Sequence, residues 1–595
     1  MKETDVQSPD YFHKVVNCQY ACPAHTPVPE YIRLIAEGRY TDAYMVNWKS
    51  NVFPGILGRV CDRPCEPACR RGRVEETPVA ICRLKRIAAD KKEDIQPYLP
   101  SIPETKNGKH IALIGGGPAS LTVARDLLPH GYEITLFDRE AKAGGMIRSQ
   151  IPSFRLPETV LDEEVDLVLE MGVNTRFGMD VTSLKAVLDE SFDAVFIGTG
   201  APTGRDINIP GRDAAGDKAV IGINWLAGVA FEHIKKSPNK VIVLGGGNTA
   251  MDCCRTALRL GASDVNVVVR SSFEDMKASP WEKDDALAEG ISFVNHHVPK
   301  EYVITDGKLT GMLFDVVESV YDDSGKRSLV PTGQKPVLIE CDEVLVAIGQ
   351  DATFPWIERD LDIEFDKWGL PVLNKESLQS SRADVFFGGD AAFGPENVIT
   401  AVAHGHQAAI SIDLFCQSKD LQTERPAEGY ELISQKMGVH EWSYQNAVSN
   451  DARQAVPHME TGQAIKDRKA EVELGFDEQQ ALNEALRCLS CDVHTVFDAK
   501  RCIECGACDD VCPMDCINFI DNGDETDLRS RLRVPSPDGS EELYVSDDLK
   551  TGQVMIKDED VCLHCGLCAE RCPTGAWDMQ KFILNQGQVA TDAKA

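Results

Sequence analysis

The stretch IALIGGGPASLTVARDLLPHGYEITLFDRE, residues 111–140, joins an apolar strand, a glycine-rich turn, a helix and a second apolar strand. Gly115 and Gly117 fill the first two positions of a G-x-G-x-x-G pattern, and Ser120 fills the third. Such glycines let backbone N–H groups approach a pyrophosphate at the N-terminus of the helix. Asp138 ends the second strand, where a carboxylate can accept a hydrogen bond from a ribose hydroxyl. The stretch therefore predicts a dinucleotide-binding domain of the parallel α/β class.

A second unit of the same kind is VIVLGGGNTAMDCCRTALRLGASDVNVVVRSS, residues 241–272. Its loop is formed by Gly245, Gly247 and Ala250, and its second strand ends in Arg270 instead of an acidic residue. An acidic residue there favours NAD, whereas an arginine can hold the 2′-phosphate of NADP. An exposed arginine is also common at a strand end, so the prediction is a site for NAD(P)H.

A third glycine-rich stretch, VFFGGDAAFGPENVITAVAHGHQAA at residues 385–409, places Asp390 after two glycines and before an alanine-rich helix. We interpret this carboxylate as a partner for the ribityl or phosphate part of a flavin. The strand-like stretches 342–350 and 385–394 follow the second loop and are both predicted to return the chain to the first domain. One nucleotide domain is therefore expected to be inserted into the other.

The C-terminal hundred residues carry the pattern C-x2-C-x2-C-x3-C-P twice. This pattern is typical of a module with two iron–sulfur clusters, in which the fourth cysteine of each run ligates the other cluster. Zinc is the main alternative, but zinc sites usually use two separated pairs of ligands. The predicted ligand sets are Cys502, Cys505, Cys508 and Cys572 for one cluster, and Cys562, Cys565, Cys568 and Cys512 for the other.

Further cysteines cluster outside this module. They are Cys18, Cys22, Cys61, Cys65, Cys69 and Cys82 near the N-terminus, and the pair Cys488 and Cys491 in ALRCLSCD. With the eight of the tail they make sixteen, enough for four [4Fe–4S] clusters with four thiolates each. Cys516 is surplus to the tail pattern. The basic residues around the N-terminal cysteines, Arg70 and Lys85 among them, are expected to balance anionic clusters or to dock an acidic carrier.

The bulk composition fits a large globular protein. The chain of 595 residues has 43% hydrophobic residues and a formal net charge of −32, which disfavours binding to nucleic acid or to an anionic membrane. No apolar run reaches the roughly 18 residues of a membrane helix, and the first residues lack the apolar core of a signal peptide. A cytoplasmic location and no membrane span are therefore predicted.

Five segments are expected. They are a helical iron–sulfur domain at 1–100, a flavin domain at 101–237 and 342–424, an NAD(P)H domain at 238–341, a helical linker with the C-x2-C pair at 425–495, and a two-cluster α+β domain at 496–595. Within the last segment, residues 521–560 are predicted to be a long, acidic, surface-exposed insertion, either a docking element or an idle loop.

Several motifs together resemble one known family. NCQYACPAHTPVPEYI (17–32), GRVCDRPCEPACRRG (58–72) and VAICRLKR (79–86) are similar to the N-terminal iron–sulfur domain of the glutamate synthase small subunit. Dihydropyrimidine dehydrogenase and the bifurcating ferredoxin:NADP oxidoreductase large subunit share this domain. The glycine motifs beginning at residues 115, 144, 245 and 388 resemble the FAD and NAD(P)H domains of the same family, and the tail resembles bacterial two-cluster ferredoxins. The resemblance implies two Rossmann-like domains, one inserted in the other.

The resemblance also implies the binding residues. FAD is expected at Gly115, Gly117, Ser120, Asp138, Gly145, Met146, Arg155, Gly200, Gly349, Gly389, Asp390, Asn397 and Val398. NAD(P)H is expected at Gly245, Gly247, Asn248, Thr249, Ala250 and Arg270. NADPH-using relatives often have two successive arginines where this chain has Arg270 and Ser271, so NADH is a second candidate.

Carried over from the family, Cys22, Cys61, Cys65 and Cys69 would bind one N-terminal cluster, and Cys18 would belong to another. Family members usually have more cysteines just before the position of Cys18, and this chain has none. We therefore expect Cys82, Cys488 and Cys491 to complete that second cluster, a hypothesis based on the cysteine count and the C-x2-C spacing.

These parts predict an oxidoreductase that passes electrons between NAD(P)H, FAD and four [4Fe–4S] clusters. A nicotinamide gives up a hydride and a cluster takes one electron, so a flavin must stand between them; no catalytic acid or base is required. The expected partner is a ferredoxin, or a 2-oxoacid:ferredoxin oxidoreductase, hydrogenase or formate dehydrogenase in a hetero-oligomeric complex. The alternatives are a glutamate synthase small subunit, a flavin-based bifurcating enzyme, and a non-catalytic iron–sulfur scaffold.

Overall fold

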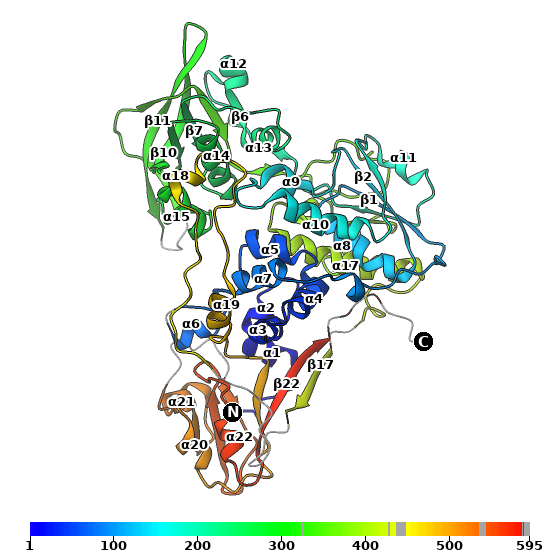
Figure 1. Cartoon of the computed structure of the whole chain (residues 1–595), viewed down its shortest axis with the longest axis vertical. Helices are drawn as coiled ribbons and strands as arrows, with labels where there is room; N and C mark the ends of the chain where they lie inside the picture. Colours follow the sequence, from blue (N-terminus) through cyan, green and yellow to red (C-terminus); the bar gives the residue numbers. More distant parts are fainter. Residues whose placement is uncertain are drawn as a thin grey trace. The chain divides into compact units, whose positions relative to one another are not determined.

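The computed structural model describes residues 1–75, 77–322, 327–426, 429–435, 448–534, 543–585, 587 and 589 (Figure 1). The chain divides into two compact units. We call Met1–Ser101, Glu424–Pro457 and Gly475–Ala595 the cysteine-rich unit, and Ile102–Thr423 with His458–Leu474 the glycine-loop unit. Among the described residues, no helix has both the length and the apolar character that crossing a membrane requires.

The glycine-loop unit contains a first sheet of five parallel strands in the order β16-β4-β1-β2-β3. The strands are β1 (His110–Ile114), β2 (Glu133–Asp138), β3 (Asn174–Phe177), β4 (Ala194–Ile197) and β16 (Val385–Phe387). Its helical elements are α8 (Pro118–Leu127), η2 (Leu128–His130), α9 (Gly145–Gln150), α10 (Glu158–Leu169), α11 (Leu184–Leu188), α16 (Asp390–Phe393) and α17 (Val398–Cys416). The central strands are buried along nearly their whole length, as in a parallel sheet with both faces covered.

A second parallel sheet has the order β6-β14-β7-β8-β9. Its strands are β6 (Ala219–Ile221), β7 (Lys240–Leu244), β8 (Asp264–Val268), β9 (Ser292–Val294) and β14 (Glu343–Val346). Its helical elements are α12 (Arg212–Ala215), η3 (Gly216–Lys218), α13 (Gly222–Ala230), α14 (Asn248–Arg259) and α15 (Pro280–Ala288). The predicted α/β class, with two Rossmann-like domains, is confirmed by these two parallel sheets.

The stretch 342–350 does not return to the first sheet as predicted. Its strand β14 pairs in parallel with β7 on one side and with β6 on the other. All four residues of β14 are buried, and an apolar strand buried in this way needs ladder partners on both edges. The strand that does enter the first sheet is β16, beside β4. The chain passes between the two sheets twice, once at β5 (Thr203–Gly204) and once at β15 (Gln350–Asp351), and these two short strands pair antiparallel.

An antiparallel sheet follows β9 within the same unit. It consists of β10 (His297–Thr305), β11 (Lys308–Tyr321), β12 (Arg327–Pro331) and β13 (Val337–Glu340), with β11 pairing all three others. The remaining helix of the unit is α18 (Thr461–Ala464), whose Ala464 packs in one small cluster with Phe154 and with Val472, a residue beyond the helix.

The cysteine-rich unit begins with short helices. They are α1 (Pro9–Val15), α2 (Asn17–Tyr20), α3 (Val28–Ala36), α4 (Tyr40–Asn51), α5 (Pro54–Val60), α6 (Arg71–Val74), α7 (Ile81–Asp90) and η1 (Gln96–Tyr98). Helix α19 (Glu478–Ala485), from far along the chain, adds Ala481 and Ala485 to the apolar core of α3 and α7. A capping box at Asp477 and Gln480 begins α19.

The C-terminal part of this unit contains two antiparallel sheets of three strands, β17-β22-β18 and β19-β21-β20. The strands are β17 (Gly429–Ser434), β18 (Val493–Phe497), β19 (Ile517–Asp521), β20 (Leu543–Val545), β21 (Gln553–Asp558) and β22 (Trp577–Asn585). The helices are α20 (Ala507–Val511), α21 (Glu525–Ser530) and α22 (Leu567–Arg571). Phe12 of α1 lies in the same core, stacked on Phe582 with ring centroids 3.7 Å apart.

Two expectations for this region need correction. The segment 425–495 is not a helical linker throughout, because β17 forms sheet hydrogen bonds with β22 and residues 458–474 belong to the other unit; residues 427–428 and 436–447 lie outside the described part. The insertion 521–560 is not simply a surface loop, because β20 and β21 bury Val554, Met555 and Ile556. Residues 535–542 of the insertion lie outside the described part.

Candidate cofactor sites

The first glycine loop leaves no room for side chains. Gly115 has a φ of +93°, and a Cβ added to it would lie 2.7 Å from the carbonyl oxygen of Gly198. A Cβ on Gly145 would lie 2.8 Å from the Cα of Gly117, the N-cap of α8. Three chain segments therefore meet backbone to backbone at the open end of α8, where unpaired N–H groups can receive a pyrophosphate.

Asp138, at the end of β2, holds this loop in place. Its Oδ2 accepts a hydrogen bond from the N–H of Gly116 at 2.6 Å, and its Oδ1 accepts one from Glu140 at 2.8 Å. Burial raises the pKa of the carboxyl group, although these backbone donors act against that shift. A carboxylate oxygen can accept two hydrogen bonds, so a ribose hydroxyl at Asp138 stays a prediction.

Other predicted flavin residues surround the same loop. The Sδ of Met146 lies 3.3 Å from where a Cβ of Gly200 would stand, and Gly389 packs near Ala119 of α8. Asn397 caps α17, whose first residue is Val398, by accepting the N–H of Thr400. Burial raises the pKa of Asp390 to about 6.

Two buried hydroxyls at this loop, Ser120 Oγ and Thr199 Oγ1, have no hydrogen-bond partner among the described residues. A polar ligand would satisfy such groups, because buried polar atoms are usually hydrogen-bonded. The cradle of glycines, the buried carboxyls and these hydroxyls therefore fit the dinucleotide part of FAD.

Arg155 and Gly349 are not brought to this loop. The Arg155 guanidinium pairs with Asp252 of α14 at 2.7 Å and with Glu282 of α15 at 2.6 Å. Burial raises the pKa of Asp252 to about 6. Gly349 lies at the crossing between the two sheets, where its carbonyl oxygen accepts the N–H of Arg205. Both residues shape the connection between the two parallel sheets.

The second glycine loop repeats the geometry of the first. Gly245 has a φ of +136°, and a Cβ there would lie 2.1 Å from the carbonyl oxygen of Ala347. Gly247 is the N-cap of α14, and Asn248, the first residue of that helix, accepts the N–H of Ser279 at 2.8 Å. Ala250 is buried, Thr249 is half-buried and Arg270 is exposed at the end of β8. The contributions of Ser279 and Ala347 were not predicted, because no local pattern marks them.

Four N-terminal cysteines, Cys22, Cys61, Cys65 and Cys82, form what we call the Cys22 set. Cys82 exchanges side-chain hydrogen bonds with Cys61 and Cys65. Although burial acts in the opposite direction, the thiols of Cys82, Cys61, Cys22 and Cys65 together raise the pKa of Lys85. Lys85 is thus a buried cation beside a buried thiol cluster.

A second group, the Cys18 set, contains Cys18, Cys69, Cys488 and Cys491. Burial, and then the thiols of Cys69, Cys491 and Cys488, raise the pKa of Cys18 well above its usual range. The pair from ALRCLSCD therefore lies near Cys18, although more than four hundred residues of chain separate them.

The electrostatic interactions group two of these cysteines differently from the expected division. Cys69, expected with Cys22, lies with Cys18, and Cys82, expected with Cys18, lies with Cys61 and Cys65. Residues 61–70 lie outside any helix, between α5 and α6, so the spacing of four does not put Cys69 on the same side as Cys61 and Cys65. Cys82 instead enters from the first turn of α7.

The tail contains two further groups, which exchange their fourth cysteines. Electrostatic interactions join Cys502 with Cys572 and Cys505, and Cys508 with Cys502, and we call these four the Cys502 set. They also join Cys565 with Cys562 and Cys512, and Cys568 with Cys562 and Cys565; these four form the Cys562 set. Cys516 has its Sγ 3.5 Å from that of Cys512, so the surplus thiol lies beside the Cys562 set.

All sixteen of these cysteines are free thiols. Groups of four closely spaced thiols beside buried cations, as with Lys85, are the donor chemistry that iron–sulfur clusters require. The residues present therefore fit iron–sulfur clusters.

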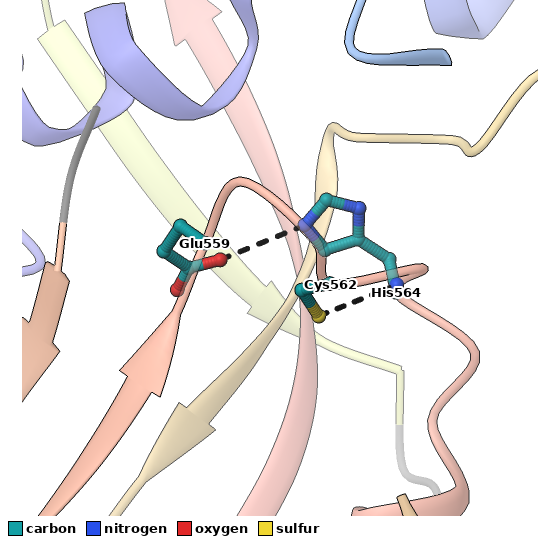
Figure 2. A group of neighbouring side chains, drawn as sticks. All are labelled: Glu559, Cys562 and His564. Atoms are coloured by element: carbon teal, nitrogen blue, oxygen red, sulfur yellow. Dashed lines mark hydrogen bonds and ion pairs between the residues drawn. The ribbon is translucent and has the colours of Figure 1, made fainter. Parts of the chain in front are cut away.

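A buried polar network supports the Cys562 set (Figure 2). Ligand atoms of Glu559, Cys562 and His564 all lie within 4.8 Å of one another, the distance expected around a metal ion. However, Glu559 also receives the Lys557 ammonium at 2.7 Å and the Tyr11 hydroxyl at 2.8 Å. Cys562 belongs to its set of four thiols, and its Sγ accepts the backbone N–H of His564 at 3.4 Å. We therefore interpret the group as an ion-pair network behind a cluster site.

Comparison with known proteins agrees with each part of this geometry. The pyridine nucleotide-disulphide oxidoreductase family matches residues 109–405. The dihydropyrimidine dehydrogenase domain II with a 4Fe-4S cluster matches residues 12–96, and a 4Fe-4S dicluster domain matches residues 501–576.

Relatives match most of the chain. The NADP(+)-dependent formate dehydrogenase subunit beta of Moorella thermoacetica is 36% identical over 504 residues, 80% of this chain and 70% of the relative. The NADPH-Fe(3+) oxidoreductase subunit beta of Geobacter sulfurreducens is 33% identical over 82% of this chain and 77% of the relative. The glutamate synthase [NADPH] small chain of Escherichia coli is 31% identical over 66% of this chain and 87% of the relative.

The two glycine loops, the thiol groups and these relatives lead to one conclusion. The chain is an FAD-dependent NAD(P)H oxidoreductase with iron–sulfur domains, and it belongs to the pyridine nucleotide-disulphide oxidoreductase family, in the group that includes the glutamate synthase small chain.

Proposed function

We propose that this chain is the NAD(P)H-linked subunit of a hetero-oligomeric enzyme, with one FAD and four [4Fe–4S] clusters. The observation that supports the proposal is the gathering of sixteen thiols into four groups of four in a chain that also carries two nucleotide loops. Four thiolates are the usual ligand number of such a cluster. A scaffold protein would have no need of the two glycine loops.

The chain's own residues bind and orient the cofactors. The glycine loops at Gly115 and Gly245 admit pyrophosphates, and Asp138 and Asp390 are the proposed carboxyl contacts of the FAD. When bound, the flavin and the clusters supply the exchange between a hydride and single electrons. Lys85 beside the Cys22 set and Arg70 beside Cys491 and Cys562 are buried cations that would offset the negative charge of thiolates there, which tunes reduction potential.

The substrate site of the complex is proposed to lie on the partner. The relative from Moorella thermoacetica is called a formate dehydrogenase beta subunit, which supports a formate dehydrogenase type of partner. A hydrogenase, a 2-oxoacid:ferredoxin oxidoreductase and a free ferredoxin are the other proposed partners.

Anaerobic purification from the native host tests this proposal. We expect about 16 irons per FAD, reduction of a viologen dye by NAD(P)H, and a co-purifying oxidoreductase subunit that is itself not a nucleotide oxidase. Iron at half that ratio would contradict the cluster count. A preparation without flavin and without dye reduction would favour a scaffold.

Glutamate synthase is the second candidate. It is favoured by the match to 87% of the Escherichia coli small chain. The tail of residues 496–595 argues against it, because that relative is matched over only 66% of this chain. A co-purifying subunit with glutaminase activity would reverse the order of the two candidates. Flavin-based bifurcation stays a prediction of the family resemblance.

A further inference from the structure

The four thiol sets form a sequence of neighbours within the cysteine-rich unit. Tyr31 interacts electrostatically with Cys65, Cys82 and Cys22 of the Cys22 set and also with Cys18. Arg70 interacts with Cys491 of the Cys18 set and with Cys562 of the Cys562 set. Cys568 of the Cys562 set interacts with Cys508 of the Cys502 set. Each set is thus adjacent to another set. Arg70 lies between the Cys18 set and the Cys562 set of the tail.

Arg70 connects the two cluster sites through a short series of contacts. It directly follows Cys69 in the chain, and its Nη1 donates a hydrogen bond to the carbonyl oxygen of Glu559. The same Nη1 lies 3.8 Å from Glu559 Oε2. His564 Nε2 lies 3.8 Å from that same oxygen, and the His564 backbone donates to Cys562 Sγ. Glu559 itself stands three residues before Cys562.

The contacts among Arg70, Glu559 and His564, which we call the junction, are fully enclosed. Side-chain exposure is 1% for Arg70 and 0% for Glu559 and His564, and Lys557 and Tyr11 hold the other carboxylate oxygen of Glu559. A charge that is buried and fixed in this way acts on its neighbours far more strongly than one in water. The guanidinium therefore lowers the energy of added negative charge on both adjacent cluster sites.

The Cys502 set, the last in this order of neighbouring sets, reaches the surface. Cys505 of the Cys502 set is exposed, and the neighbouring Ile503 is 54% exposed. In the other three sets, every cysteine is buried or half-buried.

We propose that single electrons cross between the N-terminal domain and the tail at Arg70, from the Cys18 set to the Cys562 set, and leave at the Cys502 set. In each crossing one cluster is oxidised by one electron and the next is reduced by one; no bond forms or breaks and no proton is needed. NAD(P)H supplies the electrons, and a one-electron redox protein at the Cys502 set takes them. This inference rests on the proposed four clusters. Arg70 is a positioning residue that sets the energy of the crossing.

The first test replaces Arg70 with glutamine in the full, cluster-loaded chain. In Arg70→Gln, the midpoint potentials of the two neighbouring clusters, followed by EPR in a redox titration, should become more negative. The ratio of reduced to oxidised cluster at these two sites, in equilibrium with NAD(P)H, should fall roughly tenfold, as about 1.4 kcal/mol of lost stabilisation produces. The rate of flavin bleaching should not change. Unchanged potentials and an unchanged ratio would overturn the proposal.

Two further variants control this test. Arg73→Gln removes an arginine three residues away that pairs with Asp560 and is 25% exposed, and it should leave the potentials as in the wild type. Arg70→Lys keeps the charge and should keep both potentials close to the wild type. If Arg70→Gln loses iron, Glu559→Gln replaces it, because removing the buried carboxylate beside Arg70 should make the potentials of both neighbouring clusters more positive. Unchanged potentials in Glu559→Gln would overturn the proposal.

The order of the last two clusters is tested separately. In Cys505→Ala, NAD(P)H should still reduce the cluster of the Cys562 set, and electron delivery to a viologen dye should fall. In Cys568→Ala, NAD(P)H should fail to reduce the cluster of the Cys502 set, although dithionite still reduces it. The opposite pattern would place the exit at the Cys562 set. A wild-type chain with fewer than four clusters would instead overturn the proposed function, before any of these variants is compared.

Discussion

At the scale of single residues, the flavin site depends on glycines, which have no side chain. Gly115 needs both a positive φ and the absence of a Cβ, because that atom would meet the carbonyl oxygen of Gly198. This requirement was predictable, since the G-x-G spacing, the strand before it and the helix after it are all local in sequence. The contact with Gly198 was not predictable, because it joins residues that only the parallel order of β1 and β4 brings together.

We predict that Gly115→Ala loses FAD. The added methyl group would overlap the Gly198 carbonyl, and overpacking of this kind costs about 1–3 kcal/mol, enough to weaken FAD affinity roughly tenfold. The flavin-to-iron ratio of the purified protein measures the effect. Gly172→Ala is the matched control, because Gly172 also has a positive φ, +118°, but open space around its Cβ position. An equal loss of flavin in the two variants would show that backbone strain, and not the cradle, is responsible, and full flavin in Gly115→Ala would contradict the prediction.

Asp390 gives a prediction for pH. Burial raises the pKa of this carboxyl to about 6, from 3.8 in an exposed aspartate. The folded chain therefore holds the proton more tightly than the unfolded chain, so this group's contribution to stability falls as pH rises from about 4 to about 6 and stays low above that. Asp390→Asn should raise the melting temperature of the FAD-depleted chain at pH 7.5 and have little effect near pH 4. A pH-independent effect would contradict the assignment.

At the scale of elements, the two N-terminal cluster sites show where sequence spacing stops being informative. The eight tail cysteines could be assigned to sets because their pattern repeats. Cys69 and Cys82 could not be assigned in this way. The non-helical segment 61–70 and the first turn of α7 decide which way each of these two thiols faces. The pairing of Cys488 and Cys491 with Cys18 was inferred from the cysteine count and the C-x2-C spacing.

The corrected division predicts how iron losses combine. Cys69→Ser and Cys491→Ser each should remove about four irons per chain, and the double variant should also remove about four, because both thiols serve one cluster. Cys82→Ser combined with Cys491→Ser should remove about eight, because these thiols serve different clusters. Iron analysis of the anaerobically purified proteins gives the result. Losses of about eight for the first pair and four for the second would restore the division expected from the sequence.

At the scale of the whole molecule, the two ends of the sequence fold together. Helix α1 from the N-terminus lies in the core of the tail, where Phe12 stacks on Phe582 and is 2% exposed. Neither this packing nor the division of the linker between two units could be predicted, because neighbours so distant in sequence leave no local pattern. The class of the nucleotide domains and of the tail was predictable from local motifs.

We predict that Phe12→Ala destabilises the cysteine-rich unit by about 3–5 kcal/mol, the usual cost of removing a buried aromatic side chain. The loss should appear as a lower midpoint for release of the clusters in a denaturant titration, followed by the visible absorbance of the iron. Tyr98→Ala, at a side chain that is 56% exposed, should change the midpoint by less than about 0.5 kcal/mol. Equal midpoints for the two variants would place α1 outside the core.

The Cys18 set has a consequence for biosynthesis. Two of its thiols emerge from the ribosome among the first hundred residues, but the other two, Cys488 and Cys491, arrive only after both nucleotide domains have been made. This site therefore stays incomplete during most of translation. A chain that ends before Cys488 lacks two thiols of this site, whereas the Cys22 set is complete by residue 82.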